Sequence, residues 1–404
     1  MNKEELKQYF LLRDSSEYRR SSYDKFIKDK HFSFDIKSIH ITGTNGKGSV
    51  ANFLKNIYKR KYKVGLFNSP FLDDVRDMIL INDESISFDE FISILEEYKS
   101  DFDKYGLTSF EIQTIIAYTY FQRQNVDLAI IEVGMGGYID ATNIINPMLS
   151  IITSVSLEHT MYLGRSVSEI AESKSGIIKK NSLALVGKLS EEAMYPIREH
   201  IKEVNAELHI VDDYHNVRKV SNQLAFDYFG FKDLRINTLA EYQIKNACLA
   251  VEATRLLQNK ISIDDKDIKD GLLDKFLNCR FEYVKENVLI DGAHNVEAIT
   301  SLVDSLKYIN KPIHIIFAVF KDKNVEQMLV TLSSLTNDIT LTTFDHKRAR
   351  KEEDFFLYLG DYEFKEDFKE LLKEKLEQYP NDLILITGSL AFAGVMRRYI
   401  KENA

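Results

Sequence analysis

The sequence predicts an α/β protein with two domains: a large N-terminal domain with a mostly parallel, P-loop-type sheet, and a smaller C-terminal α/β domain. Short apolar runs of strand length alternate with amphipathic segments of helix length almost from end to end. The strand-length runs are almost continuously apolar, as expected for parallel strands covered on both faces. The length of 404 residues also fits two or three domains, at about 100–200 residues each.

The strands and helices of the first half follow one another in this rhythm. Continuous apolar runs predict strands at 38–43, 63–69, 127–134, 149–156 and 183–187. Apolar residues spaced three or four apart predict helices at 49–60, 88–100, 109–125 and 167–180. Strands that alternate with helices in this way indicate βαβ units.

The pattern changes after residue 206 and then resumes. The segments 207–214 and 223–231 have the alternation of half-exposed antiparallel strands, which predicts an appended hairpin, and a long helix is expected at 240–258. After Asp274 the α/β alternation restarts, with strands expected within 281–291, 311–320, 338–344 and 382–388. We therefore predict a boundary near Arg280, which gives an N-terminal domain of residues 1–279 and a C-terminal domain of residues 280–404.

The composition excludes several classes of protein. Apolar residues make up 44% and charged residues 28%, which is ordinary for a soluble globular protein. No run approaches the ~18 apolar residues that cross a bilayer, and the charged N-terminal stretch has no apolar core of a secretory signal. Two cysteines, Cys248 and Cys279, are too few for a disulfide scaffold, so a cytoplasmic location is expected. The net charge of −9 argues against a nucleic-acid partner.

The strongest motif is GTNGKGS, which lies between a predicted strand and a predicted helix. Its residues are Gly43, Thr44, Asn45, Gly46, Lys47, Gly48 and Ser49. Glycines there let backbone N–H groups surround a phosphate at a helix N-terminus. Lys47 can reach the outer phosphates and the Ser49 hydroxyl can join a Mg²⁺ shell. A tight turn with an incidental lysine is the alternative, since Gly48 interrupts the strict P-loop pattern.

Two further motifs follow the next strands of the same sheet. In EVGMGGYIDATN, Glu132 ends a buried strand at the carboxyl edge of the sheet, where ligands bind in open α/β folds, and could hold Mg²⁺ opposite Ser49. In SLEHT, His159 could ligate a metal, although a lone histidine is more often structural. Taken alone, Lys174 on the next helix is a surface lysine.

Two loops of the C-terminal domain have the same strand–turn–helix arrangement. IDGAHN places Asp291 at the end of an apolar strand and His294 in the turn that follows. LITGSLAFAG places Ser389 in a turn of small residues after another strand. Either loop alone is ordinary, and the two together suggest a second substrate face.

In this order and at these distances, the motifs resemble the Mur ligase superfamily and, within it, the folylpolyglutamate synthases, which often double as dihydrofolate synthases. The resemblance runs from about Ile39 to Arg397 and also includes QIKN at 243–246 and FKDKN at 320–324. It implies a Mur-ligase central-type domain that binds ATP, followed by a Rossmann-like domain that helps to bind an amino acid. It implies that a carboxylate is activated as an acyl phosphate, which the amine of L-glutamate then attacks.

The resemblance also implies roles for individual residues. Gly43 to Ser49 would hold the ATP phosphates, with Asn246, Arg280 and Asp291 also contacting the nucleotide. Ser49 and Glu132 would bind one Mg²⁺, His159 and Glu132 a second, with Lys174 carbamylated toward that second ion. Ser69, Pro70 and Phe71 would lie on the folate side, and His294 and Ser389 near glutamate. Catalysis would then rest on Lys47, Lys174 and His294.

The chain departs from the family pattern at several of these motifs. Phe71 stands where the family has histidine, and Met78 where it has arginine, both expected near the pterin side. Glu158 replaces an aspartate, and Ser173 a glutamate, beside the expected metal site. These changes lie on the expected acceptor and metal sides, outside the motif GTNGKGS.

The sequence therefore predicts an ATP-dependent ligase that adds L-glutamate to a (tetrahydro)folate, acting as a monomer on small molecules and without a membrane partner. Dihydropteroate, giving dihydrofolate synthase, or a non-folate acid are alternative acceptors. A non-catalytic homologue that binds nucleotide or folate is an alternative of another class. The joint presence of the metal-side and amine-side residues argues against it.

Overall fold

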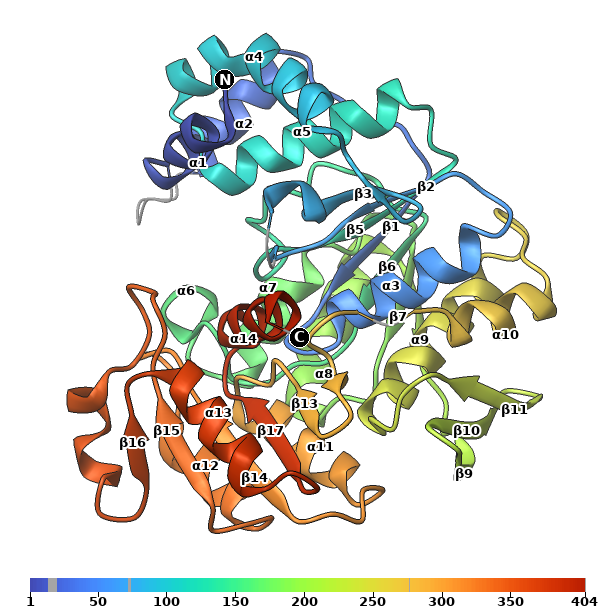
Figure 1. The fold of residues 1–404 in the computed structure, drawn as a ribbon. Helices are drawn as coiled ribbons and strands as arrows, with labels where there is room; N and C mark the ends of the chain where they lie inside the picture. Colours follow the sequence, from blue (N-terminus) through green and yellow to red (C-terminus); the bar gives the residue numbers. More distant parts are fainter. Residues whose placement is uncertain (14–19, 72–73, 276, 404) are drawn as a thin grey trace. The chain divides into compact units, whose positions relative to one another are not determined.

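The computed structural model describes residues 1–13, 20–71, 74–275 and 277–403. These residues form two compact units, one of Met1–Asp213 with Asn246–Asp274, the other of Tyr214–Lys245 with Lys275–Ala404. Both units are α/β structures (Figure 1). The predicted fold class is therefore confirmed.

The first unit is built on an eight-stranded sheet. Its strands are β1 (Ser38–Thr42), β2 (Val64–Phe67), β3 (Ile79–Ile81), β4 (Glu84–Ser85), β5 (Leu128–Glu132), β6 (Leu149–Ile152), β7 (Leu183–Val186) and β8 (Glu207–Ile210). They lie in the order β4-β3-β2-β5-β1-β6-β7-β8. All neighbouring pairs from β2 to β8 are parallel, and β3 and β4 extend the sheet as an antiparallel edge. β1 therefore lies in the interior of the sheet, between β5 and β6.

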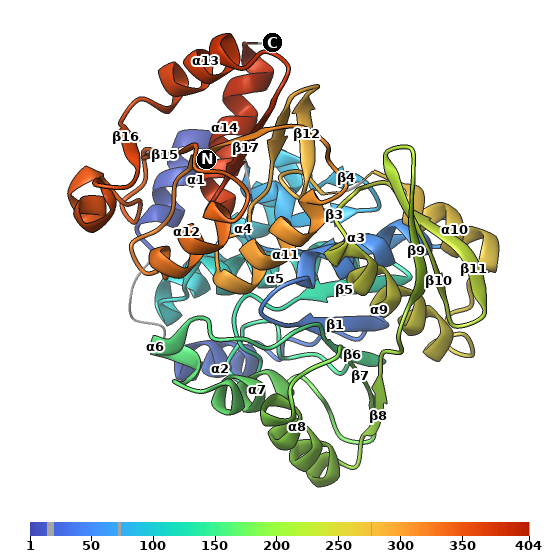
Figure 2. The ribbon, with the colours of Figure 1, turned by 90° about the horizontal axis from the view of Figure 1, so that it is seen from below.

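Helices of the first unit cover this sheet. They are α1 (Lys3–Leu11), α2 (Arg20–Asp29), α3 (Lys47–Tyr58), α4 (Phe88–Tyr105), α5 (Ser109–Arg123), α6 (Thr160–Leu163), α7 (Val167–Ser175), α8 (Glu191–Val204) and α10 (Asp265–Leu273), with a 3₁₀ turn η1 (Val75–Met78). α3 packs on β1, β2 and β5, and α10 packs against α3. Figure 2 shows α7 and α8 side by side, and the two helices pack closely together.

Two apolar clusters hold these layers together. The larger one joins the α1, α2, α4 and α5 helices to alternate residues of β5, Ala129 and Ile131. The smaller one joins α7 and α8 to β6 and β7. Because successive strand residues point to opposite faces, Ile130, which lies between Ala129 and Ile131, points to the other face of the sheet. α3 packs against β5. Covering on both faces explains why the strands are almost continuously apolar.

One predicted element of this unit is wrong. The segment that begins at Glu207 was expected to pair in an antiparallel hairpin, but it forms β8, which pairs with β7 in parallel and widens the large sheet. Its burial is that of an edge strand, partly exposed along its length, and this alternation is also what an antiparallel hairpin would show. The pattern therefore could not distinguish the two.

The second unit is built on a six-stranded sheet of order β12-β13-β17-β14-β15-β16. Its strands are β12 (Glu282–Lys285), β13 (Val288–Ile290), β14 (Ile313–Phe317), β15 (Ile339–Thr342), β16 (Glu363–Lys365) and β17 (Leu383–Thr387). Its helices are α11 (Val296–Leu306), α12 (Val325–Ser333), α13 (Phe368–Gln378) and α14 (Leu390–Glu402), with a 3₁₀ helix η2 (Glu352–Tyr358). Only β12 is antiparallel to its neighbour.

A three-stranded antiparallel sheet belongs to the second unit (Figure 2). It consists of β9 (His215–Val220), β10 (Gln223–Tyr228) and β11 (Phe231–Ile236), so the predicted hairpin at 223–231 is part of a three-stranded meander. The helix α9 (Tyr242–Leu256) follows, and the chain passes from the second unit to the first within it. No helix among the described residues is both long and apolar enough to cross a membrane.

Candidate active site

The predicted phosphate loop lies between β1 and α3. Gly46 has a φ of 89° and directly precedes the first turn of α3, while no side chain caps that helix end. The first N–H groups of a helix have no partner within the helix, so this turn offers donors to an anion. The Lys47 ammonium lies 2.8 Å from the Gly43 carbonyl oxygen and 3.3 Å from that of Thr44. Lys47 therefore folds back over the loop that it would serve.

Residues after β6 hold the phosphate loop in place. The Thr44 N–H donates to the Ser154 carbonyl at 2.9 Å, and the Asn45 N–H donates to the Ser154 hydroxyl at 2.9 Å. The Thr153 hydroxyl donates to the Asn45 carbonyl at 2.6 Å. Sequence reasoning missed Thr153 and Ser154 as supports, because only the parallel pairing of β1 with β6 brings them beside the loop.

Asn246 on α9 lies against the same loop. A Cβ atom on Gly46 would collide with the Asn246 amide oxygen. Glycine is therefore required at position 46 for two reasons. A side chain would collide with Asn246, and the left-handed backbone of this residue disfavours any side chain. Gly46 and Asn246 therefore form one wall of the candidate nucleotide site.

Glu132 ends β5 at the carboxyl edge of the sheet, where it pairs in register with Ile41 of β1. Its side chain is buried, with 3% of the residue exposed. The segment 133–143, which we call the glycine loop, follows directly and contains Gly134, Gly136 and Gly137. The register places Glu132 beside the end of β1, from which the candidate phosphate loop leaves.

Lys174 is not a surface lysine: only 3% of the residue is exposed. It lies in the last turn of α7, a helix that begins with a capping box between Ser166 and Glu169. The pKa of Lys174 is lowered to about 7, mainly by burial and also by the positive charge of Lys47. The carboxylate of Glu158 opposes this shift by raising the pKa. A substantial fraction of Lys174 is therefore a neutral amine near pH 7.

His159 differs in its surroundings from the other predicted metal-side residues. It has a φ of 51° and immediately precedes the short helix α6. Its side chain is 40% exposed, and its Nε2 lies 3.8 Å from a carboxylate oxygen of Glu158, whose own side chain is only 8% exposed. Of the two neighbours, Glu158 is the buried one, and sequence reasoning gave it no role.

The candidate metal ligands suit a hard cation through oxygen. A hydroxyl on Ser49 and a buried carboxylate on Glu132 are ligands that Mg²⁺ accepts, and Mg²⁺ usually completes its shell with water and substrate phosphates. Ser49 and Glu132 therefore fit an ion whose remaining positions are taken by water and substrate phosphates. Within the described ranges, no group of three or more histidine, cysteine, aspartate or glutamate side chains is arranged to hold a metal.

The predicted folate-side residues separate into two groups. Ser69 and Pro70 lead from β2 to Phe71, which is 46% exposed. Met78, by contrast, is 2% exposed and belongs to the large apolar cluster of the first unit. The expectation that Met78 lies at the pterin side is therefore not supported, because its side chain packs in the core.

In the second unit, Asp291 directly follows β13 and is 2% exposed. One carboxylate oxygen accepts from the Tyr242 hydroxyl at 2.6 Å and from the Phe281 N–H at 2.8 Å, and the other accepts from the Ala293 N–H at 2.8 Å. Burial raises the pKa of Asp291, while the nearby Arg280 charge and these hydrogen bonds act against that rise. Tyr242 is a partner that the sequence did not reveal.

Arg280 lies between two residues with left-handed backbone. Cys279 has a φ of 58° and Phe281 a φ of 52°. Non-glycine residues in this conformation cost about 1 kcal/mol or more each, and such strain gathers at functional sites. The Phe281 N–H bond to Asp291 and the Gly292 N–H bond to the Cys279 carbonyl hold this turn.

His294 and Ser389 lie on loops that follow adjacent strands, β13 and β17. The Gly388 N–H donates to the Ala293 carbonyl at 3.1 Å, which joins the two loops. His294 Nδ1 lies 3.0 Å from the Gly292 carbonyl oxygen, so this nitrogen carries a proton. The Ser389 hydroxyl is buried and makes no hydrogen bond to any described residue. Such an oxygen is a ready partner for a polar ligand.

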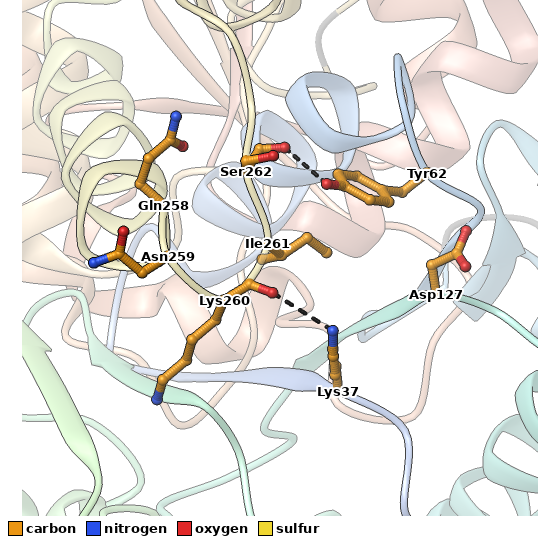
Figure 3. A pocket seen from close by; sticks show the side chains of 8 residues that line it. All are labelled: Lys37, Tyr62, Asp127, Gln258, Asn259, Lys260, Ile261 and Ser262. Carbon is orange, nitrogen blue, oxygen red and sulfur yellow. Dashed lines mark hydrogen bonds between the residues drawn. The ribbon is translucent and has the colours of Figure 1, made fainter.

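A hollow of about 280 Å³ in the first unit lies elsewhere (Figure 3). Its lining includes Lys37, which precedes β1, and Asp127, which precedes β5. It therefore opens at the amino edge of the sheet, opposite the phosphate loop. Within it Lys37 donates to the Lys260 carbonyl and Tyr62 to the Ser262 carbonyl. This hollow is not the candidate active site.

Comparison with known proteins agrees with this geometry. The Mur ligase middle domain matches residues 41–254, and the Mur ligase glutamate ligase domain matches residues 279–390. A Bacillus subtilis dihydrofolate synthase/folylpolyglutamate synthase is 31% identical over 91% of each chain. A Saccharomyces cerevisiae dihydrofolate synthetase is 33% identical over 77% of each chain.

A solved complex of a folylpolyglutamate synthase with AMPPCP and folate has a TM-score of 0.87. It is 26% identical and covers 99% of this chain and 100% of its own. The two family models cover residues 41–254 and 279–390, the segments that contain the motifs from the phosphate loop to Ser389. The chain belongs to the Mur ligase superfamily, in the group formed by folylpolyglutamate synthases and dihydrofolate synthases.

Proposed function

We propose that this protein is an ATP-dependent ligase that joins L-glutamate to the carboxylate of a reduced folate. The observation that carries the proposal is the buried Lys174, which lies within electrostatic reach of Lys47 on the phosphate loop. A protein that only bound nucleotide would have no use for a buried, part-neutral lysine there. The Bacillus subtilis relative and the folate-bound structure support the choice of substrates.

The reaction proceeds in two transfers. The substrate carboxylate attacks the γ-phosphorus of ATP, giving an acyl phosphate and ADP. The amine of glutamate then attacks the acyl carbon, forming the amide, losing a proton and releasing phosphate. Lys47 and the N–H groups of the loop Gly43 to Ser49 neutralise the phosphate oxygens as the two anions approach. Ser49, Glu132 and His159 would hold two Mg²⁺ ions, which supply further charge neutralisation.

We assign Lys174 to the second of these ions as a carbamate. Carbamylation requires a neutral amine, and burial of Lys174 supplies one near pH 7. The product carries a negative charge, so it would relieve the unfavourable proximity of Lys174 to Lys47. Lys174 thereby acts on the metal side as a carboxylate would.

Activity is therefore expected to rise when bicarbonate is restored to CO₂-depleted enzyme. At a fixed partial pressure of CO₂ the effect should grow as pH rises through about 7, because the neutral fraction of Lys174 grows over that range. A ¹³C carbamate resonance that is present in wild type and absent in Lys174→Met would identify the site. Full activity without CO₂ and no such resonance would contradict the carbamate.

The second unit would contribute to the nucleotide and to glutamate. We propose that Arg280 and Asp291, with Asn246 of the first unit, contact the nucleotide. His294 and Ser389 would contact glutamate, and the buried Ser389 hydroxyl supports this. We keep residues 1–279 and 280–404 as the proposed functional domains, with residues 214–245 grouped structurally with the second.

Phe71 is expected to affect the acceptor rather than ATP. Its exposed ring can stack on a flat pterin, but it cannot donate a hydrogen bond as a histidine would. Phe71→His should lower KM for the folate a few-fold and leave KM for ATP unchanged, as steady-state kinetics would measure. Phe71→Ala should raise KM for the folate. Equal KM values in all three proteins would exclude Phe71 from the acceptor site.

A panel of acceptors tests the function itself. Phosphate release would be measured with tetrahydrofolate, dihydropteroate and non-folate carboxylates, each with and without glutamate. Glutamate-dependent release with tetrahydrofolate is expected. Dihydropteroate is the second candidate, favoured by the Saccharomyces cerevisiae relative. Release with neither compound would refute the folate assignment.

We further propose that the enzyme is a monomer of the cytoplasm that acts on small molecules. Both cysteines, Cys248 and Cys279, are buried free thiols, and burial raises the pKa of Cys279 to about 12. Such thiols are inert and compatible with a reducing compartment. The acidic net charge of −9 supports the absence of a nucleic-acid partner.

A further inference from the structure

Two side chains on one face of β1 bind the glycine loop. The Thr42 hydroxyl donates to the Gly136 carbonyl at 2.5 Å, and His40 Nε2 lies 2.8 Å from the Thr142 hydroxyl oxygen. His40 and Thr42 are two residues apart on a strand, so they share a face. Both are fully buried, as is Thr142. The strand that ends in the phosphate loop thus holds the glycine loop at two points.

The hydrogen bonds at Thr142 have one possible direction. Asp140 accepts from both the Thr142 N–H, at 3.0 Å, and the Thr142 hydroxyl, at 2.5 Å. Because that hydroxyl has a single proton, the bond to His40 must be donated by His40 Nε2. Burial lowers the pKa of His40 to about 3, so the ring is neutral and its proton stays on Nε2. The network therefore has a single arrangement.

The other side of the glycine loop rests on the end of α7. The Tyr138 N–H donates to the Ser173 carbonyl at 3.0 Å, and the Asn143 side-chain amide donates to the Gly176 carbonyl at 3.1 Å. A Cβ atom on Gly137 would lie 2.6 Å from the Ser173 carbonyl oxygen and 2.8 Å from that of Lys174. The loop backbone therefore touches the helical turn that carries Lys174.

We infer that His40 and Thr142 are positioning residues, which through the glycine loop fix Lys174 relative to the phosphate loop. Neither is exposed to a substrate, since both are fully buried. The inference rests on the proposed function, because it gives Lys174 a part in the reaction. A misplacement of about 1 Å far from the reacting atoms can cost a hundredfold in rate. A network with one arrangement limits such misplacement.

Thr142→Val and Thr142→Ser test the inference. Valine keeps the size and branching of threonine but removes the hydroxyl, whereas serine keeps it. Thr142→Val should lower kcat about 10- to 100-fold with KM for ATP, glutamate and folate within about twofold of wild type. Thr142→Ser should restore most of kcat. His40→Leu should lower kcat similarly, and the double variant His40→Leu with Thr142→Val should lose little more, because both remove one interaction.

Thr254→Val is the matched control. The Thr254 hydroxyl is also buried and donates to a carbonyl, that of Val251, within α9. The Thr254→Val substitution removes a comparable hydrogen bond that does not involve the glycine loop, so kcat should stay within about twofold of wild type. If Thr142→Val behaves like Thr254→Val, the network is only structural. If Thr142→Val raises KM for the folate at constant kcat, Thr142 serves the acceptor, and the inference is also wrong.

Crystal structures test the inference without reference to activity. In Thr142→Val the distance between the Cα atoms of Gly43 and Lys174 should differ from wild type, and in Thr142→Ser it should not. An unchanged distance in Thr142→Val would overturn the inference. Failure of the proposed function would look different, since wild type would then release no phosphate with any folate.

Discussion

Lys47→Ala should abolish ligation and leave the fold intact. The Lys47 ammonium lies over the phosphate loop, bonded to the carbonyls of Gly43 and Thr44, so it adds little to packing. Stabilisation of transition-state charge by one such group is typically worth ~2.7–4 kcal/mol, which corresponds to a loss of about 100- to 1,000-fold in kcat. Coupled ATPase and glutamate-incorporation assays would measure the loss.

Lys61→Ala is the control for this experiment. Lys61 is exposed just beyond the other end of α3, where it donates to the Ser262 hydroxyl. The Lys61→Ala substitution removes the same positive charge far from the phosphate loop, so activity should be unchanged. Near-normal turnover in Lys47→Ala, with its melting temperature preserved, would show that the loop binds no phosphate.

Glu132→Gln should also abolish ligation. The change keeps the shape of the side chain and removes the negative charge that would hold Mg²⁺ at the carboxyl end of β5. We expect kcat to fall at least about 100-fold and the Mg²⁺ concentration for half-maximal activity to rise. A magnesium titration at saturating ATP would separate the two effects.

Asp127→Asn gives the matched comparison, at the residue that directly precedes the same strand. Asp127, whose side chain Figure 3 shows, precedes β5 at the opposite edge of the sheet. Its carboxylate accepts a hydrogen bond from the Lys63 N–H. Removal of this charge should not change the magnesium requirement. If activity depends on the Mg²⁺ concentration in the same way in both variants, Glu132 is not a metal ligand.

The sequence predicted the elements that depend on local patterns. Apolar runs at β1 and β5, and the helical spacing in α3 and α7, are properties of short segments, and all four elements form where expected. The proposed phosphate loop is recognised from an equally local pattern, because its glycines, lysine and hydroxyl lie within seven consecutive residues, 43–49. Position along a strand also placed Glu132 at the correct edge of the sheet.

What the sequence did not predict depends on the packing of distant segments. The burial of Lys174 follows from the glycine loop lying across α7, which no local pattern encodes. Met78 stands where the family has an arginine, and the sequence therefore suggested that a positive charge was missing near the pterin. Tertiary packing instead places its side chain in the core. β8 has the alternation of any half-exposed strand, and only its partner decides whether it runs parallel or antiparallel.

The second unit is made of two stretches that are separated by residues 246–274. The first stretch holds the meander, and it bonds to residues of the second stretch. Lys219 of β9 donates to the Tyr308 carbonyl, and Glu241, which follows the meander, accepts from the Tyr308 hydroxyl. A gene fragment that begins at Arg280 would therefore encode only part of the second unit. During synthesis the meander leaves the ribosome well before its partners, so the second unit must close a long loop and fold slowly.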